Sequence, residues 1–314
     1  MARDPRPQAA VSARATPPEE GQPPRVSLVL GSGGARGLAH IGIIHRLEEA
    51  GYRIDSIAGA SIGALVGGIY AAGSLDSYRD WVCALRSTDV LRFLDLSFSV
   101  GGLFKGDRII DTLREMVGDH AIEDLPLAYT AVATDIDRQR EVWITSGPLF
   151  EAIRASIAVP TIFTPYEYQG LTLVDGGLLN PVPIAPTFRD FTDLTIAVSL
   201  NGEPRSIAKA SRPGPRPVAE PAETDLRSRI QQFLDAMTDS RPVVHDRDLG
   251  MFELVGRSFE VMQNAIAAVK LATYAPDIVI EVPRDACGSY EFHRAREMIE
   301  LGYRLAVDQV PPRS

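Results

Sequence analysis

The chain has 314 residues, of which 45% are hydrophobic and 23% are charged, and its formal net charge is −9. This composition is typical of a globular protein with one large domain or two small ones. An acidic chain lacks the basic surface that phosphate backbones require, so we expect no nucleic acid partner. Net charge alone would not hold it on an anionic membrane either.

Residues 1–24 combine proline, alanine and charge and lack the apolar core of a signal peptide. We interpret them as a disordered N-terminal tail; a transit peptide is the alternative, which the acidic residues of the segment disfavour. No apolar run reaches the length of about 18 residues that a membrane-spanning helix needs. Cys83 and Cys287 show neither a disulfide framework nor metal-site spacing. These features favour a cytoplasmic protein, with peripheral contact at the inner membrane face as an open alternative.

Strand and helix patterns alternate in the first part of the chain. Residues 25–30 form a short apolar strand, and the next residues carry apolar side chains at helical spacing as far as Gly51. A second strand at residues 53–59 and a second helix at residues 62–73 follow. Strand, helix, strand and helix at this spacing predict a parallel sheet covered by helices.

The later elements extend this pattern. A helix is expected at residues 148–160, and an amphipathic helix at residues 290–310 closes the chain. Further strands are expected at residues 127–136, 140–146, 171–179, 194–200 and 277–282. Residues 202–225 are rich in proline, alanine and charge, which indicates a flexible insertion. The sequence therefore predicts an α/β fold, a three-layer sandwich with a mostly parallel central sheet, in one domain over residues 25–310.

A serine lies at the junction of the second strand and helix, in Gly59-Ala60-Ser61-Ile62-Gly63. G-x-S-x-G between a strand and a helix is the pattern of a nucleophile elbow, a sharp turn that lifts the hydroxyl out of the sheet. The two glycines permit the close backbone approach, and the start of the helix favours a developing anion. The alternative is a packing turn in which Ser61 only caps the helix.

A glycine-rich loop, residues 31–37 (GSGGARG), follows the first strand. One interpretation is a dinucleotide-binding loop, since Asp55 lies at the distance of a ribose ligand; however, Arg36 occupies the third glycine position and Gly37 comes one residue late. The other is an oxyanion hole, in which consecutive N–H groups converge on one point. In a parallel sheet, this loop and Ser61 would emerge at the same edge. A glycine turn for tight helix packing remains the third reading.

A serine nucleophile needs a base. Of the five histidines, only His245 and His293 come late enough in the chain for the usual order of a triad, and both look like surface residues. Asp175 is the other candidate, because it ends a strand and is followed by Gly176 and Gly177, whose N–H groups could orient its carboxylate. Asp-Gly between apolar runs is also a favoured hairpin turn.

Together these residues resemble the patatin-like phospholipase family, in which a glycine-rich loop with a basic residue, a G-x-S-x-G serine and a later D-G-G/A aspartate occur in this order. Here they are residues 31–37 with Arg36, the motif around Ser61, and Asp175 with its two glycines. Residues 154–165 are similar to the helix-to-proline segment of the family. The resemblance covers residues 25–200, and the end of the chain looks like that of bacterial members. It implies a patatin-like fold and a serine acyl hydrolase that acts on phospholipid or lysophospholipid esters.

The resemblance also implies a role for each motif residue. Ser61 would be the nucleophile and Asp175 the base, in a dyad without histidine. Gly33 and Gly34 would supply oxyanion N–H groups, with Ile62 adding another. Arg36 would face the lipid phosphate. The framework glycines are Gly31, Gly37, Gly59, Gly63, Gly176 and Gly177.

No metal or cofactor is implied, and the expected partner is a lipid or fatty acyl ester, with peripheral membrane contact. Leu103 and Phe104, next to Lys105, would suit a mobile lip over the acyl site; a packed connection to the next helix is the alternative. An acyltransferase with the same acyl-enzyme and a nucleotide-binding protein are the rival functions. No pattern in the sequence specifies an oligomeric state.

Overall fold

The structure is a computed structural model that describes residues 22–86, 105–160, 162–204 and 251–310. The expected N-terminal tail and insertion lie almost wholly outside these residues, as do Leu103 and Phe104 of the expected lip. The strands are β1 (Arg25–Leu30), β2 (Arg53–Ala60), β3 (Ala128–Asp135), β4 (Arg140–Ile144), β5 (Tyr166–Tyr168), β6 (Leu171–Asp175), β7 (Leu194–Gly202) and β8 (Ile278–Pro283). The helices are α1 (Ala39–Glu49), α2 (Ile62–Ala71), α3 (Leu75–Ala84), α5 (Asp107–Val117), α6 (Leu149–Ser156), α9 (Met251–Tyr274) and α10 (Ala295–Gln309).

In the described residues, eight strands form one sheet in the order β5-β6-β3-β2-β1-β7-β8, and β4 pairs with β3. The pairs that join β3, β2, β1, β7 and β8 are parallel. β4, β5 and β6 pair in antiparallel fashion. The predicted α/β fold with a mostly parallel central sheet is therefore confirmed.

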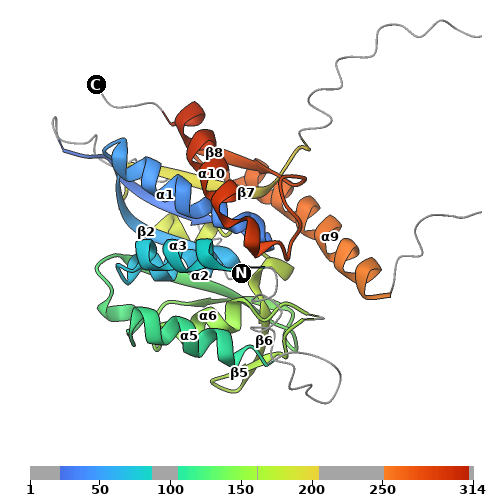
Figure 1. Cartoon of the computed structure of the whole chain (residues 1–314). Coiled ribbons are helices and arrows are strands. Elements are labelled where there is room, and N and C mark those ends of the chain that lie inside the picture. The colour runs from blue at the N-terminus through green and yellow to red at the C-terminus, as the bar shows by residue number, and fades with distance from the viewer. Residues whose placement is uncertain (1–21, 87–104, 161, 205–250, 311–314) are drawn as a thin grey trace, which may run out of the picture.

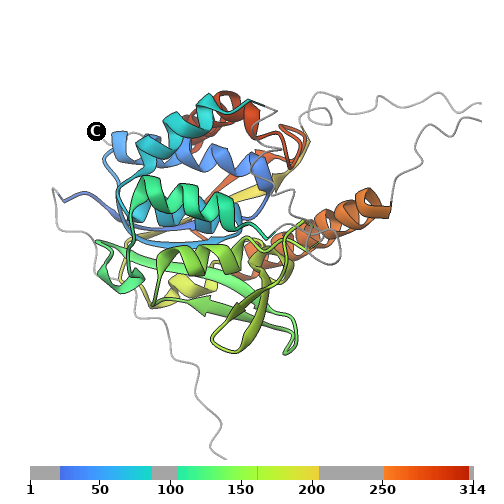
Figure 2. The ribbon, with the colours of Figure 1, turned by 60° about the horizontal axis from the view of Figure 1, so that its bottom comes forward.

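Side chains of β1 alternate between two cores, as the period of a strand requires. Leu28 and Leu30 point into the larger core, which helices such as α1, α2, α6 and α10 cover, whereas Val29 points into a smaller core that includes Ala267 of α9. The sheet thus lies between two layers, and α9 belongs to the thinner one (Figure 1). The end of α9 at Met251 projects away from the sheet (Figure 2).

The register of the parallel strands sets where the loops emerge. Leu30, the last residue of β1, pairs with Gly59 of β2 and with Val198 of β7. The glycine-rich loop after β1 and the turn after β2 therefore leave the sheet at the same carboxyl edge. Ligands of open α/β sheets bind at such an edge.

Helix α10 packs closely on α1 (Figure 1). A Cβ atom on Gly42 would lie 1.9 Å from the carbonyl oxygen of Ile299, and one on Gly302 would lie 2.0 Å from that of Ala39. The two helix backbones are therefore in direct contact. This contact holds α10 in place against α1.

No helix in the described ranges combines the length and the apolar character that crossing a membrane requires.

Candidate active site

Ser61 lies on a strained turn between β2 and α2. Its φ of 55° and ψ of −125° are unusual for a residue with a side chain. The Ser61 N–H donates to Oγ of Ser156 at 2.9 Å, and that hydroxyl donates to the carbonyl of Val132 at 2.6 Å. Ser156, at the end of α6, thus connects the turn to β3. Sequence reasoning did not single out Ser156, although it lies within the segment 154–165.

The glycines around Ser61 leave no room for side chains. A Cβ atom on Gly59 would lie 2.5 Å from the carbonyl oxygen of Gly63, and one on Gly63 would lie 2.1 Å from that of Leu30. A Cβ atom on Gly37 would lie 2.2 Å from the side chain of Ile62. The turn after β2 is therefore packed against the end of β1 through backbone atoms, and against the glycine-rich loop through the side chain of Ile62.

Asp175 ends β6 beside the serine turn. Val132 and Ala133, successive residues of β3, pair with Ala60 and Asp175, so the end of β2 and the end of β6 meet on the same strand. Gly176 follows, where a Cβ atom would lie 2.0 Å from the carbonyl oxygen of Val132. This pairing brings residues 61 and 175 to one place, although 114 positions separate them in the sequence.

The Asp175 carboxylate is fully buried, and only one of its two oxygen atoms accepts a hydrogen bond from the described residues. Its Oδ1 atom accepts the N–H of Gly177 at 2.7 Å, while no described residue gives Oδ2 a hydrogen bond. Burial raises the pKa of Asp175 to about 7, against the opposing effects of the nearby Ser61 hydroxyl and the Gly177 N–H. A carboxyl group with such a pKa can take up and release a proton near neutral pH.

The N–H groups of the glycine-rich loop differ in whether the described residues supply an acceptor. The N–H groups of Gly31, Ser32 and Ala35 donate to backbone carbonyls outside the loop at 2.8 to 3.0 Å. In the described part of the chain, no acceptor takes those of Gly33 and Gly34. Both glycines line a cavity together with the serine and the aspartate, so an oxygen atom bound there would meet free donors.

Ile62 begins α2 directly after Ser61 and is buried. Its N–H belongs to the first turn of a helix, where the aligned peptide dipoles favour negative charge. Asp55, the candidate ribose ligand, lies near the other end of β2, where Arg53 contacts it at 2.7 Å. Asp55 and the glycine-rich loop therefore lie at opposite ends of the strand, which disfavours the dinucleotide interpretation.

Two cavities meet at Ser61. The larger, of about 1140 Å³, is lined by the glycine-rich loop, Asp175, α9 and the residues that follow β8. The smaller, of about 180 Å³, has an almost wholly apolar lining and shares Gly34 and Ser61 with the larger one. Its apolar residues include Leu65, Tyr78, Trp81, Val82, Ile109 and Leu113. The serine hydroxyl therefore lies between an apolar compartment and a wider, more polar one.

The histidines lie elsewhere. His40 is fully buried, its Nε2 atom lies 2.9 Å from the carbonyl oxygen of Gly31, and burial lowers its pKa to about 4. None of the described histidines, which are His40, His45, His120 and His293, lines either cavity. His245 lies outside the described residues.

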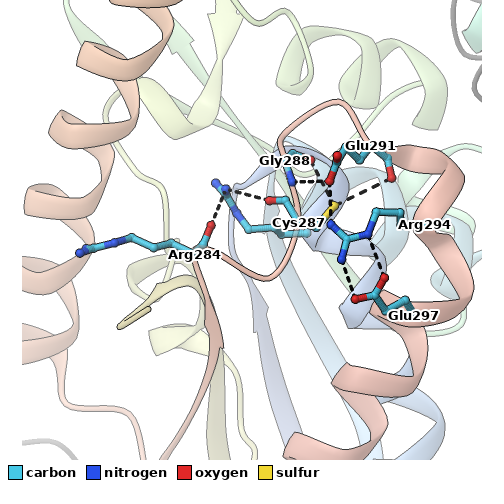
Figure 3. Close-up of polar contacts among 7 residues, drawn as sticks. Arg284, Cys287, Gly288, Glu291, Arg294 and Glu297 are labelled. Carbon is cyan, nitrogen blue, oxygen red and sulfur yellow. Dashed lines mark hydrogen bonds and ion pairs between the residues drawn. The ribbon is translucent and has the colours of Figure 1, made fainter. Parts of the chain in front are cut away.

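Arg36 is buried in the lining of the larger cavity, but its guanidinium is engaged by the protein. Nη1 donates to the carbonyls of Arg284 and Cys287 at 3.2 and 3.5 Å, and Nη2 lies 3.5 Å from Oε1 of Glu260. Figure 3 shows the segment that carries these carbonyls. Sequence reasoning predicted a phosphate ligand here and could not find these acceptors, which lie far away in the chain.

Helix α9 contributes a second residue that sequence reasoning missed. Gln263 is buried and donates from Nε2 to Oγ of Ser32 at 3.2 Å. A Cβ atom on Gly177 would lie 2.3 Å from the same Nε2 atom. The helix therefore covers both the glycine-rich loop and the turn after Asp175.

Comparison with known proteins shows the family to which the chain belongs. A model of the patatin-like phospholipase family matches residues 28–188. An uncharacterized NTE family protein of Mycobacterium tuberculosis is 42% identical over 325 residues, with 90% of each chain covered. A lysophospholipase of Pyricularia oryzae is 29% identical over 293 residues, which cover 90% of this chain and 18% of that protein. Neuropathy target esterase of Drosophila melanogaster is 32% identical over 227 residues, covering 65% of this chain and 16% of that protein.

The family match begins inside β1 and ends after the turn that follows Asp175, so it contains all three motifs of the site. The alignment with the mycobacterial relative covers 90% of this chain, well beyond the residues that the family model matches. The chain belongs to the patatin-like phospholipase family of lipid-ester hydrolases.

Proposed function

We propose that the protein is a serine acyl hydrolase that cleaves fatty acyl esters of phospholipids or lysophospholipids through Ser61 and Asp175. The observation that carries this proposal is the shared cavity: a serine on a strained turn and a buried aspartate with an unpaired oxygen line it together. The name of the Pyricularia oryzae relative, a lysophospholipase, supports the same class of substrate.

The chemistry follows from the two side chains. Asp175 accepts the proton of the Ser61 hydroxyl while Oγ attacks the ester carbonyl carbon, and the carbonyl electron pair moves onto oxygen. The N–H groups of Gly33, Gly34 and Ile62 stabilise this oxyanion. Its collapse expels the alcohol, which takes the proton from Asp175, and leaves an acyl-enzyme. Asp175 then takes a proton from a water molecule as its oxygen attacks the acyl carbon. Collapse of this second oxyanion breaks the bond to Ser61 Oγ and releases the fatty acid, and Oγ takes the proton back from Asp175.

The two cavities suggest how a lipid ester binds. The apolar cavity suits the acyl chain, because burying hydrocarbon there removes it from water. The larger cavity, with its polar and charged lining, suits the glycerol and the head group. An acyltransferase would use the same acyl-enzyme with an alcohol in place of water, so analysis of products in the presence of competing alcohols separates the two activities.

A fluorophosphonate probe tests the proposal. We expect the probe to label the wild-type protein at Ser61, and a panel of phospholipids and lysophospholipids to yield free fatty acid. Ser61→Ala should abolish both signals. Ser258→Ala, the same change at an exposed position of α9, should leave labelling intact. Saturable nucleotide binding without labelling would instead support a nucleotide-binding protein and overturn the proposal.

The pH dependence should report Asp175. Because the base must be ionised to accept the serine proton, and burial raises its pKa to about 7, kcat/KM for a short acyl ester should increase with pH up to about 7 and then level off. Below this range we expect about a tenfold loss for each pH unit, as a single ionisation requires. A profile that is flat between about pH 5 and 8 would show that no group with this pKa is the base.

A further inference from the structure

Residues 284–291, which we call the C-terminal loop, form one side of the larger cavity. They connect β8 to the 3-10 segment Phe292–Arg294 that precedes α10. Its lining residues are Arg284, Asp285, Cys287, Gly288, Ser289 and Tyr290. This loop lies directly against the glycine-rich loop, although about 250 residues separate the two in sequence.

The outer end of the C-terminal loop is attached to α10 by charged side chains (Figure 3). Glu291 Oε2 accepts the N–H of Gly288 at 2.9 Å and Nη1 of Arg294 at 2.7 Å. Arg294 also donates to both carboxylate oxygens of Glu297, at 2.6 and 2.8 Å. These bonds fix the end of the loop next to α10, which we call its outer end. The end next to β8, its inner end, is held by other contacts.

Arg36 supplies the contacts at the inner end. Its side chain is 6% exposed and donates to the carbonyls of Arg284 and Cys287, and Glu260 of α9 lies beside it. A buried guanidinium is tolerated only where hydrogen bonds and an opposite charge replace water. The partners that the described residues give its two Nη atoms all come from the C-terminal loop and α9, while its buried Nε atom has no hydrogen-bond partner among them. The Nη atoms of Arg36 therefore hold these two segments.

The C-terminal loop in turn constrains the glycine-rich loop. The carbonyl of Ser289 accepts the N–H of Ala35 at 2.9 Å, and the Ser289 hydroxyl donates to Glu260 Oε1 at 2.6 Å. Gly34 has a φ of +59°, and a Cβ atom there would lie 2.5 Å from the same Ser289 carbonyl. Arg36, Glu260, Ser289 and Ala35 thus form a closed series of contacts around Gly34.

We propose that Arg36 is a positioning residue: it holds the C-terminal loop against the glycine-rich loop, so that the N–H groups of Gly33 and Gly34 stay directed into the cavity, and it does not bind the phosphate of the substrate. This inference rests on the proposed function, because it assumes that these N–H groups stabilise the oxyanion. It assigns the C-terminal loop to the catalytic framework, although that loop contains none of the family motifs.

A substrate without phosphate separates the two roles of Arg36. If Arg36 bound phosphate, Arg36→Gln would raise KM for phospholipids and leave a neutral short acyl ester unaffected. If Arg36 positions the loop, the same change should lower kcat for p-nitrophenyl butyrate by about 10- to 100-fold, with KM within about twofold, because small displacements of oxyanion donors have effects of this size. Arg36→Lys should recover part of kcat, since an ammonium can still donate to the loop carbonyls. Arg304→Gln, at an exposed position of α10, is the control and should change neither parameter.

A second variant tests the same contacts without relying on whether the Arg36→Gln protein folds. Ser289→Ala removes the hydroxyl that contacts Glu260 and leaves Arg36 in place. We expect it to lower kcat on the same ester, and to add little to the loss in Arg36→Gln, because both changes break one connected series. Additive losses, or an unchanged kcat in both variants, would overturn the proposal.

Hydrogen exchange distinguishes failure of this inference from failure of the proposed function. If the wild-type protein hydrolyses no ester and takes no fluorophosphonate, the proposed function fails. Faster amide exchange in residues 32–38 of Ser289→Ala, with a thermal unfolding midpoint equal to that of the wild type, would still support the contact between the loops. Unchanged exchange in these residues would contradict it, whatever the activity.

Discussion

Replacing Asp175 with asparagine is expected to lower kcat for an acyl ester by about 10³-fold or more while making the folded protein more stable at pH 8. Asparagine has nearly the same shape and can still accept the N–H of Gly177 through its oxygen. It cannot take a proton from Ser61, and loss of a general base costs about 10²- to 10⁴-fold. Hydrolysis of a short acyl ester measures the first effect.

The gain in stability has a definite sign and pH range. Burial raises the pKa of Asp175 from 3.8 to about 7 in the folded protein, so folding favours the protonated form. The cost of the buried charge is absent below about pH 4, grows between pH 4 and 7, and is complete above pH 7. Asparagine carries no charge, so its advantage should follow the same curve and reach on the order of 1–3 kcal/mol at pH 8.

Urea denaturation at pH 4.5 and pH 8 measures this difference. Asp308→Asn, the same change at an exposed position of α10, should alter the free energy of unfolding by less than about 0.5 kcal/mol at either pH. An Asp175→Asn protein that is less stable than the wild type at pH 8 would mean that the carboxylate is stabilised by its surroundings. That result would remove the physical basis for its role as a base.

Most strands and the helices α1, α2, α6 and α10 could be predicted because each carries its own periodic pattern, whereas α3, α5 and the short strand β5 were not expected. The parallel strands β1 and β2 were expected, and their register brings Gly31 and Ser61 to one edge, as a βαβ unit requires. The antiparallel pairing of β6 with β3 was not expected, because short strands do not indicate their partners. The position of α9 on the second face was not predicted either, since only its burial against β7 and the turn after Asp175 reveals it.

The site residues also divide into those that their sequence neighbours mark and those that only the fold brings to the site. Ser61 and Asp175 could be singled out because the glycines beside them mark backbone that comes too close for side chains. Ser156 and Gln263 carry no such mark, and they reach the site across 95 and 231 residues of sequence. The positive charge of Arg36 was noticed in the sequence. Its partners, however, are backbone carbonyl groups, which every residue has, so no residue type marks them. Long-range contacts of this kind can be read only from the fold.

Replacing Gly63 with alanine should have a large effect on folding. Its Cβ atom would lie 2.1 Å from the carbonyl oxygen and 2.5 Å from the carbonyl carbon of Leu30. These are backbone atoms at the end of a central strand, held by the sheet, and cannot move aside as a flexible side chain could. We expect a loss of about 3 kcal/mol or more in the free energy of unfolding. Urea denaturation measures it.

Gly256→Ala is the matched control, because a Cβ atom there meets nothing within 4 Å and the residue lies in helix α9. Alanine should stabilise that helix by up to about 1 kcal/mol, the opposite sign from Gly63→Ala.

Any Gly63→Ala protein that does fold must separate the turn of Ser61 from the end of β1, which carries the glycine-rich loop. Its labelling by a fluorophosphonate should then be slower than that of the wild type, because the oxyanion donors no longer face the serine. A stable Gly63→Ala protein that is labelled at the normal rate would show that the two loops need not touch for the serine to react.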